Sequence, residues 1–129
     1  MNNGEGKIQS FTDLFAWKEG HKLVLMVYKE TDNFPDKERY SLTDQMRRAA
    51  VSFTSNIAEG FTRRSAKEKN RFYDMAHASL VELQNQLIIA RDVGYLSNEK
   101  FKTMADQSIT ANKLINGLFR ATKDKKFIS

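Results

Sequence analysis

Four stretches of this 129-residue sequence repeat apolar residues with the period of an α-helix, and turn signals separate them. We expect helices over residues 13–31, 41–60, 66–93 and 98–121. Pro35, the only proline, ends the first stretch, because the residue before proline avoids the helical conformation. Gly60 and Gly94 are placed to end the second and third helices as C′ residues. The pattern therefore predicts an all-α chain with short connections.

Short connections make neighbouring helices antiparallel, so we expect a single domain over residues 1–129 that folds as an up-down-up-down four-helix bundle. The polar segment of residues 1–10 is expected to be a flexible arm. Gly20 lies within the first helix, and close approach of another helix would explain it. Thr12, Ser41 with Asp44, and Ser65 with Glu68 are the expected N-terminal caps. The apolar stripes include Tyr28 in the first helix, Phe53 in the second, Leu80 in the third and Ile109 in the fourth.

Composition argues against several kinds of chemistry. There is no cysteine, so disulfides and thiolate catalysis are excluded, and a cytoplasmic location is the simplest expectation. The two histidines, His21 and His77, lack the paired Glu-x-x-His motifs of a di-iron bundle, so we expect no metal and no cofactor. Ser52, Ser55 and Ser79 have no histidine at a suggestive spacing, so we expect no enzyme. No apolar run approaches the length of a membrane span, and no membrane partner is expected.

Positive charge is concentrated in the middle of the chain. Residues 41–73 carry a net charge of +4 out of +5 for the whole sequence. The basic turn holds five cations in nine residues: Arg63, Arg64, Lys67, Lys69 and Arg71. Phe61, Phe72 and Tyr73 flank these cations, a combination that suits phosphate contacts and base stacking, although a solvated helix start would have the same composition. Arg120, Lys123, Lys125 and Lys126 would extend the same field if the end of the chain lies nearby.

A second unusual feature is the set of polar residues beside the apolar stripes of the second and third helices. Asn56 follows Phe53 by three residues, and Glu59 and Glu82 lie on neighbouring faces. A charge near a core is unfavourable unless it is paired, so we expect a polar network in which Arg47 or Arg48 neutralises one of the two glutamates. The simplest role for such a network is to set the register between helices.

Six short motifs, each occurring once, are distributed along the chain: Phe11-x-x-Leu14-x-x-Trp17, Phe34-Pro35, Tyr40-x-Leu42-x-x-Gln45-x-Arg47-Arg48-Ala49-Ala50-x-Ser52, Asn56-Ile57-Ala58-Glu59-Gly60, Ala76-x-x-Ser79-Leu80-x-Glu82-Leu83 and Gly94-Tyr95-Leu96. Together they resemble the bacterial four-helix-bundle proteins called 23S ribosomal RNA intervening-sequence proteins. The resemblance covers about Phe11 to Phe119, and Phe53-Thr54 departs from it where an aliphatic residue is more usual.

The resemblance implies a bundle that assembles into a ring, usually a pentamer, and it transfers no catalytic residues. It extends to the accessory variability determinant of diversity-generating retroelements, a basic pentamer that associates with nucleic acid and a reverse transcriptase. The expected function is therefore non-catalytic binding of nucleic acid, RNA preferred over DNA, by a homo-oligomeric ring. The alternative is a protein-interaction scaffold that recruits a partner enzyme without binding nucleic acid directly.

Overall fold

The computed structural model describes residues 7–128, with side chains over residues 7–123. Four long helices follow one another: α1 (Phe15–Thr31), α2 (Leu42–Thr62), α3 (Ala66–Asp92) and α4 (Asn98–Ile128). Two short 3₁₀ turns, η1 (Phe11–Asp13) and η2 (Asp36–Glu38), precede α1 and α2, and no strand occurs within the described residues. The predicted all-α four-helix fold is confirmed.

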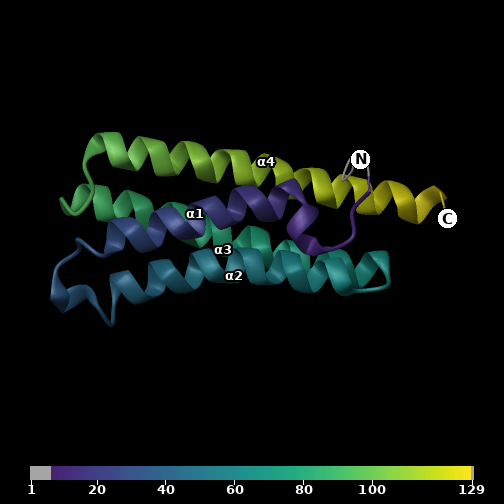
Figure 1. Cartoon of the computed structure of the whole chain (residues 1–129), viewed down its shortest axis with the longest axis horizontal. Helices are drawn as coiled ribbons and strands as arrows, with labels where there is room; N and C mark the ends of the chain where they lie inside the picture. Colours follow the sequence, from purple (N-terminus) through teal and green to yellow (C-terminus); the bar gives the residue numbers. More distant parts are fainter. Residues whose placement is uncertain (1–6, 129) are drawn as a thin grey trace.

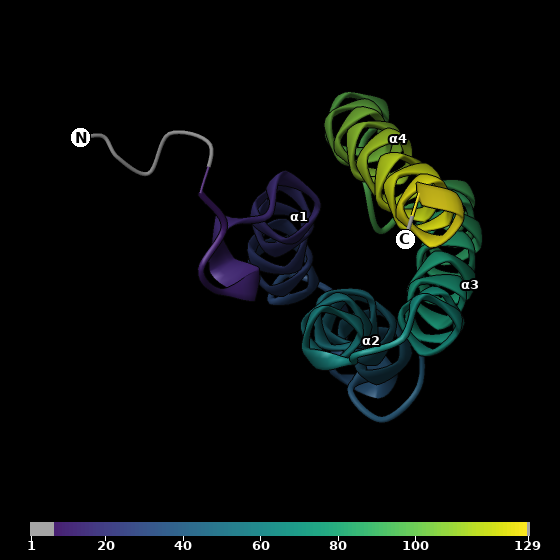
Figure 2. The ribbon, with the colours of Figure 1, turned by 90° about the vertical axis from the view of Figure 1, so that its right-hand side faces the viewer.

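Consecutive helices run in opposite directions along one common axis (Figure 1). Helix α1 packs beside α2 and α4, and α3 packs beside the same two helices, whereas the backbones of α1 and α3 are not adjacent within the described residues. The view along the bundle accordingly shows α1 and α3 at opposite corners (Figure 2). This arrangement leaves one face of every helix exposed to solvent.

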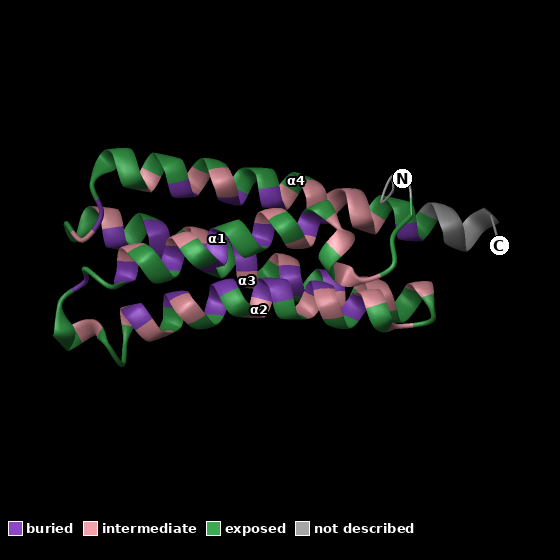
Figure 3. Ribbon diagram, in the orientation of Figure 1, coloured by how far each residue is buried: buried purple, intermediate pink, exposed green. Residues whose placement is uncertain are grey.

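Each helix turns one apolar stripe toward the centre of the bundle (Figure 3). The large side chains that are fully buried there include Leu23, Val27, Met46, Phe53, Ile57, Leu80, Leu83, Leu87, Met104 and Ile115. Burying each of these stabilises the fold by ~1.5–3 kcal/mol before the entropy of ordering the chain is counted. Two residues expected in the stripes lie elsewhere, since Tyr28 is 43% exposed and Ile109 is 48% exposed. Both lie at the margin of their stripe, where the helix surface turns from core to solvent.

Two glycines allow helices to approach closely. A Cβ atom added to Gly20 would lie 2.5 Å from Cε2 of Phe53 on α2, so the expected close approach at this position is confirmed. The prediction that Gly60 ends α2 is wrong, because α2 continues to Thr62 with Gly60 buried in its last turn. A Cβ atom there would lie 2.7 Å from the ring of Tyr73 on α3, so Gly60 serves helix packing rather than helix termination.

The two connections at the far end of the bundle from the basic turn are tied together. The rings of Phe34 and Tyr95 lie with centroids 5.2 Å apart, and the Tyr95 hydroxyl donates a hydrogen bond of 2.8 Å to Oε2 of Glu38. Gly94 has a φ of +88°, which fits its predicted role in ending α3. These contacts fix the α1–α2 connection against the α3–α4 connection.

The helix starts differ in part from the expected caps. Ser10, not Thr12, is the cap, and with Asp13 it forms a capping box on η1, so that α1 begins only at Phe15. Ser41 makes no capping hydrogen bond to α2, because its hydroxyl donates to Glu38 instead. Ser65 caps α3 as expected, accepting a hydrogen bond from the amide of Glu68.

The two ends of the chain were also the subject of predictions. Helix α4 runs to Ile128 rather than ending near residue 121. Of the segment expected to be a flexible arm, residues 1–6 lie outside the described residues. None of the helices, over the residues described, has the length and apolar character needed to cross a membrane.

Candidate nucleic-acid interface

The basic turn joins α2 to α3 at the end of the bundle toward which α4 runs (Figures 1 and 2). Arg63 leaves the helical conformation with φ −73° and ψ 152°, and α3 begins at Ala66 directly after its cap, Ser65. The connection between the two helices is therefore only three residues long, and the rest of the basic turn lies within the start of α3. Lys67 and Arg71 are four residues apart at the start of α3, so their side chains lie on the same helix face.

Phe72 lies between two arginines. The guanidinium of Arg63 lies 4.5 Å from the centroid of the Phe72 ring, and that of Arg71 lies 5.3 Å from it. Arg63 also donates a 2.8 Å hydrogen bond to Oε2 of Glu59, one helical turn earlier. Stacking on the ring and the ion pair hold the Arg63 guanidinium in place.

A groove, here called the basic groove, opens beside this ring. Its lining consists of Arg63, Ser65, Ala66, Lys67, Glu68, Asn70, Arg71, Phe72, Asp74 and Lys123. Four of these residues are cationic and two are acidic. Lys123 comes from α4, so the end of the chain adds to the field of the basic turn as the sequence suggested.

The remaining cations of the tail are placed differently. Arg120 is exposed on α4 and does not line the basic groove. The side chains of Lys125 and Lys126 lie outside the described residues.

Two polar atoms in the wall of the basic groove are buried without a protein partner: Nε of Arg63 and Oδ1 of Asn70. One is a donor and the other is an acceptor. A buried polar group without a partner is unfavourable unless water or a ligand satisfies it. Asn70 was not singled out by its sequence pattern, because a single polar residue on a helix gives no signal of its own.

Arg64 and Lys69 belong to a different surface. Both line a neighbouring, mostly apolar pocket formed with Phe61, Tyr73, Leu118 and other residues. Nζ of Lys69 donates a 2.7 Å hydrogen bond to the carbonyl oxygen of Phe61, which stabilises the end of α2. Arg64 is exposed and forms no ion pair within the described part of the chain. The structure thus divides the five cations of the basic turn into three that line the basic groove and two that do not.

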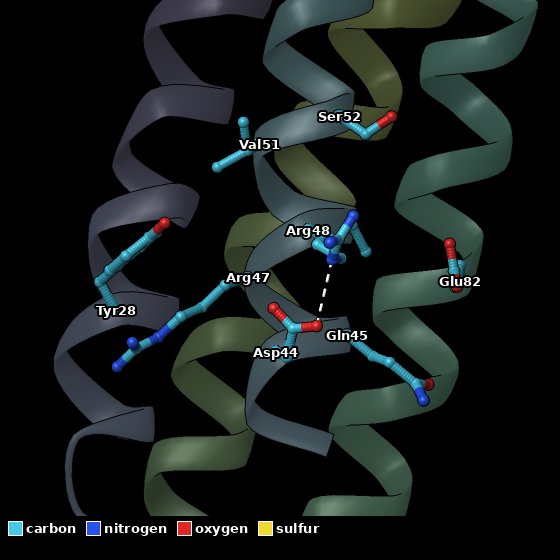
Figure 4. Close-up of a pocket in the computed structure, with 9 residues that line it drawn as sticks. Tyr28, Asp44, Gln45, Arg47, Arg48, Val51, Ser52 and Glu82 are labelled. Atoms are coloured by element: carbon cyan, nitrogen blue, oxygen red, sulfur yellow. Dashed lines mark hydrogen bonds and ion pairs between the residues drawn. The ribbon is translucent and has the colours of Figure 1, made fainter. Parts of the chain in front are cut away.

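The expected pairing of Arg47 or Arg48 with Glu59 or Glu82 is wrong. Arg47 donates hydrogen bonds to Oγ1 of Thr31 at 2.9 Å and to Oδ1 of Asp32 at 3.0 Å. Arg48 pairs with Asp44, one turn earlier on its own helix (Figure 4). A carboxylate one helical turn away is reached at lower entropic cost than one on the next helix, and Glu59 is paired in the same way with Arg63.

A polar link between α2 and α3 nevertheless exists, built from smaller side chains. The hydroxyls of Ser52 and Ser79 are hydrogen-bonded at 2.8 Å, and Asn56 donates to Ser52 at 3.1 Å. Asn56 therefore belongs to the network as predicted, but serines rather than arginines connect the helices. The spacing of four residues between Ser52 and Asn56 could be read from the sequence. No signal in the sequence indicated that their partner on α3 would be Ser79.

The two histidines lie on different helices, His21 on α1 and His77 on α3, and neither lines the basic groove. The ring of His21 stacks on Trp17 with centroids 4.7 Å apart. Nδ1 of His77 is hydrogen-bonded at 3.0 Å to Oδ1 of Asn112 on α4. Within the described residues, no group of three or more His, Cys, Asp or Glu side chains could hold a metal ion.

Fold and site together define a small helical-bundle protein with a cationic groove at one end. The sequence profile of a family described as 23S rRNA-intervening sequence protein matches residues 12–117. The chain belongs to this family, and the resemblance seen in its sequence is confirmed.

The fold is also found in a solved structure of a protein with unknown function from the S23 ribosomal protein family of Bacteroides thetaiotaomicron. The two share 18% sequence identity with a TM-score of 0.72, and the match covers 81% of this chain and 97% of that one. No curated protein matches the sequence.

Proposed function

We propose that this chain is a non-catalytic nucleic-acid-binding protein, with RNA as its preferred ligand, that acts as a ring-shaped oligomer. The observation that carries the proposal is the basic groove, where cations of the α2–α3 turn and Lys123 of α4 surround one aromatic ring. Residues far apart in the sequence thereby present one cationic surface.

Phosphate recognition accounts for the chemistry of this groove. Arg63 and Arg71 are positioned by the Phe72 ring, and the exposed Lys67 and Lys123 line the same groove. Guanidinium groups bind phosphate oxygens through two parallel hydrogen bonds, whereas ammonium groups contribute mainly charge.

The preference for RNA rests on the family, whose description refers to intervening sequences of 23S rRNA. Phosphate contacts alone do not distinguish RNA from DNA, so the groove supports the binding and the family supports the kind of nucleic acid. In a ring, each subunit would present one groove, and several weak contacts would combine as avidity.

The test is fluorescence anisotropy with labelled structured RNA and duplex DNA, using the wild-type protein and the triple variant K67Q/R71Q/K123Q. None of these three cations forms an ion pair within the described residues, and all three are exposed, so we expect their replacement to leave the fold intact. A matched control, K37Q/R39Q/K113Q, removes the same charge at exposed positions away from the groove. We expect binding by wild type and control, tighter for RNA, and loss of at least tenfold in affinity in the triple variant.

One observation favours a second function, a protein-interaction scaffold that recruits a partner enzyme. Helix α3 exposes several large apolar side chains: Met75, Val81, Ile88 and Ile89. Absence of nucleic-acid binding by the wild-type protein at low salt would contradict the first proposal and favour the scaffold.

A further inference from the structure

The exposed face of α1 carries a regular stripe of cations and apolar side chains. The α1 stripe consists of Phe15, Lys18, Lys22, Leu25 and Lys29, spaced alternately by three and four residues. Phe15 is 69% exposed and Leu25 is 57% exposed. The spacing keeps all five on one face of the helix, so apolar surface and positive charge alternate along its length.

The glutamates of α1 do not belong to this stripe. Both are engaged by residues of α4: Glu19 accepts a hydrogen bond from Gln107, and Glu30 pairs with Lys100. Although Lys22 also contacts Glu19 at 2.9 Å, its side chain is 62% exposed. The α1 stripe therefore presents a positively charged surface.

Helix α3 carries a stripe of the opposite character. The α3 stripe consists of Asp74, Met75, Val81, Glu82, Ile88 and Ile89, all exposed. Its apolar members are between 41% and 48% exposed. Asp74 and Glu82 form no ion pair within the described residues. The α3 stripe thus combines apolar surface with unpaired negative charge, and in Figure 4 Glu82 stands apart from the arginines of α2.

The two stripes lie on opposite sides of the molecule, because α1 and α3 occupy opposite corners of the bundle (Figure 2). They also match in height. Gly20 lies against Phe53, and Ser52 is bonded to Ser79, which places Gly20 roughly level with Ser79. Helices α1 and α3 run in the same direction, so with a rise of about 1.5 Å per residue Lys18 and Lys22 fall near the levels of Asp74 and Glu82.

From this charge and height complementarity, we infer that the α1 stripe of one copy binds the α3 stripe of the next copy. The inference rests on the ring proposed above and names its interface. A contact between two different faces is heterologous, so side-by-side copies with parallel bundle axes keep the heights aligned. A rotation of each copy relative to the last, about an axis parallel to the bundle, is what closes such a row into a ring. Lysines would then face carboxylates while Phe15 and Leu25 cover the apolar residues of α3.

Two single variants test the interface by light scattering coupled to size-exclusion chromatography, without nucleic acid. Leu25→Asp damages only the α1 stripe, and Ile88→Asp damages only the α3 stripe. We expect the wild type to be larger than a dimer and each variant to be a monomer. An equimolar mixture should form a one-to-one dimer, because one intact α1 stripe and one intact α3 stripe remain. A monomeric wild type, variants of wild-type mass, or a mixture that stays monomeric would each overturn the inference.

A charge exchange provides the second measurement. Lys18→Glu with Lys22→Glu should give a monomer, and adding Asp74→Lys with Glu82→Lys should restore the wild-type mass. Failure of the fourfold variant to reassemble, with helicity unchanged by circular dichroism, would contradict the proposed pairing. Anisotropy on monomeric Leu25→Asp keeps the two proposals apart, since its basic groove is intact and should still bind RNA, more weakly than the ring.

Discussion

At the scale of single residues, Gly20 shows how closely the bundle is packed. Replacing it by alanine gains ~1 kcal/mol of helix propensity but forces a methyl group into the Phe53 ring, and overpacking costs ~1–3 kcal/mol. Phe53 is fully buried and has little room to move. We therefore expect Gly20→Ala to lower the free energy of unfolding by about 1 kcal/mol in urea titrations.

Gly117 provides the matched control. It lies within α4, and a Cβ atom added there would meet nothing within 4 Å. Gly117→Ala should therefore raise the free energy of unfolding by up to ~1 kcal/mol, the ordinary gain in helix propensity. Equal effects of the two substitutions would show that the contact with Phe53 does not decide the result.

Phe72 gives a prediction for binding at the same scale. Phe72→Leu keeps an apolar side chain but removes the ring that positions Arg63 and Arg71. Each cation–π contact is worth ~0.5–1 kcal/mol at an exposed site, so affinity for RNA should fall several-fold. The slope of log affinity against log salt should not change, because the number of cations is the same; a shallower slope would contradict this role.

At the scale of elements, the hydrogen bond from Tyr95 to Glu38 joins the two connections at one end of the bundle. Hydrogen bonds from Ser41 and then Tyr95 lower the pKa of Glu38 below its usual value. The bond to Glu38 raises the pKa of Tyr95. A lowered carboxyl pKa stabilises the fold above the ordinary pKa of glutamate, and this stabilisation is lost as the pH falls through the pKa in the folded state.

Tyr95→Phe should therefore be less stable than wild type at pH 7, and the difference should shrink as Glu38 is protonated in acid. Urea titrations at pH 7 and near pH 3 measure both. Tyr40→Phe is the control, since Tyr40 is 87% exposed and its hydroxyl makes no hydrogen bond within the described residues. A difference that persists undiminished in acid would show that the Tyr95 hydroxyl stabilises the fold without the ionised Glu38 carboxylate, which would contradict this role.

Elements also show what a sequence reveals and what it leaves open. Apolar periodicity was enough for the four helices, because each stripe must face the core wherever its neighbours lie. Helix ends were harder to predict: Gly60 has the identity of a terminator, but the ring of Tyr73 packs against it and α2 continues. Partners of Arg47 and Arg48 could not be predicted either, since Asp32, directly after α1, and Asp44 on α2 compete with the carboxylates of α3.

At the scale of the whole molecule, charge is separated into distinct surfaces. The basic groove lies at one end of the bundle, and the oppositely charged stripes of α1 and α3 lie on its sides. The cations of the basic turn could be found in the sequence as a local cluster. Their division into groove and pocket, and the addition of Lys123, required the helices to be arranged in space. We propose the basic groove for nucleic acid and the two stripes for assembly, with Asp74 at the border between the groove and the α3 stripe.

The most direct test of the central claim is the salt dependence of RNA binding, measured by anisotropy for the wild type and K67Q/R71Q/K123Q. Each phosphate contact contributes about 0.7–0.9 to the slope of log affinity against log salt, so loss of three cations should make the slope shallower by about two to three. We expect this change in slope together with much weaker binding, while K37Q/R39Q/K113Q behaves as wild type. Binding by the wild type that is unchanged between low salt and about 200 mM, or a triple variant with the wild-type slope, would contradict it.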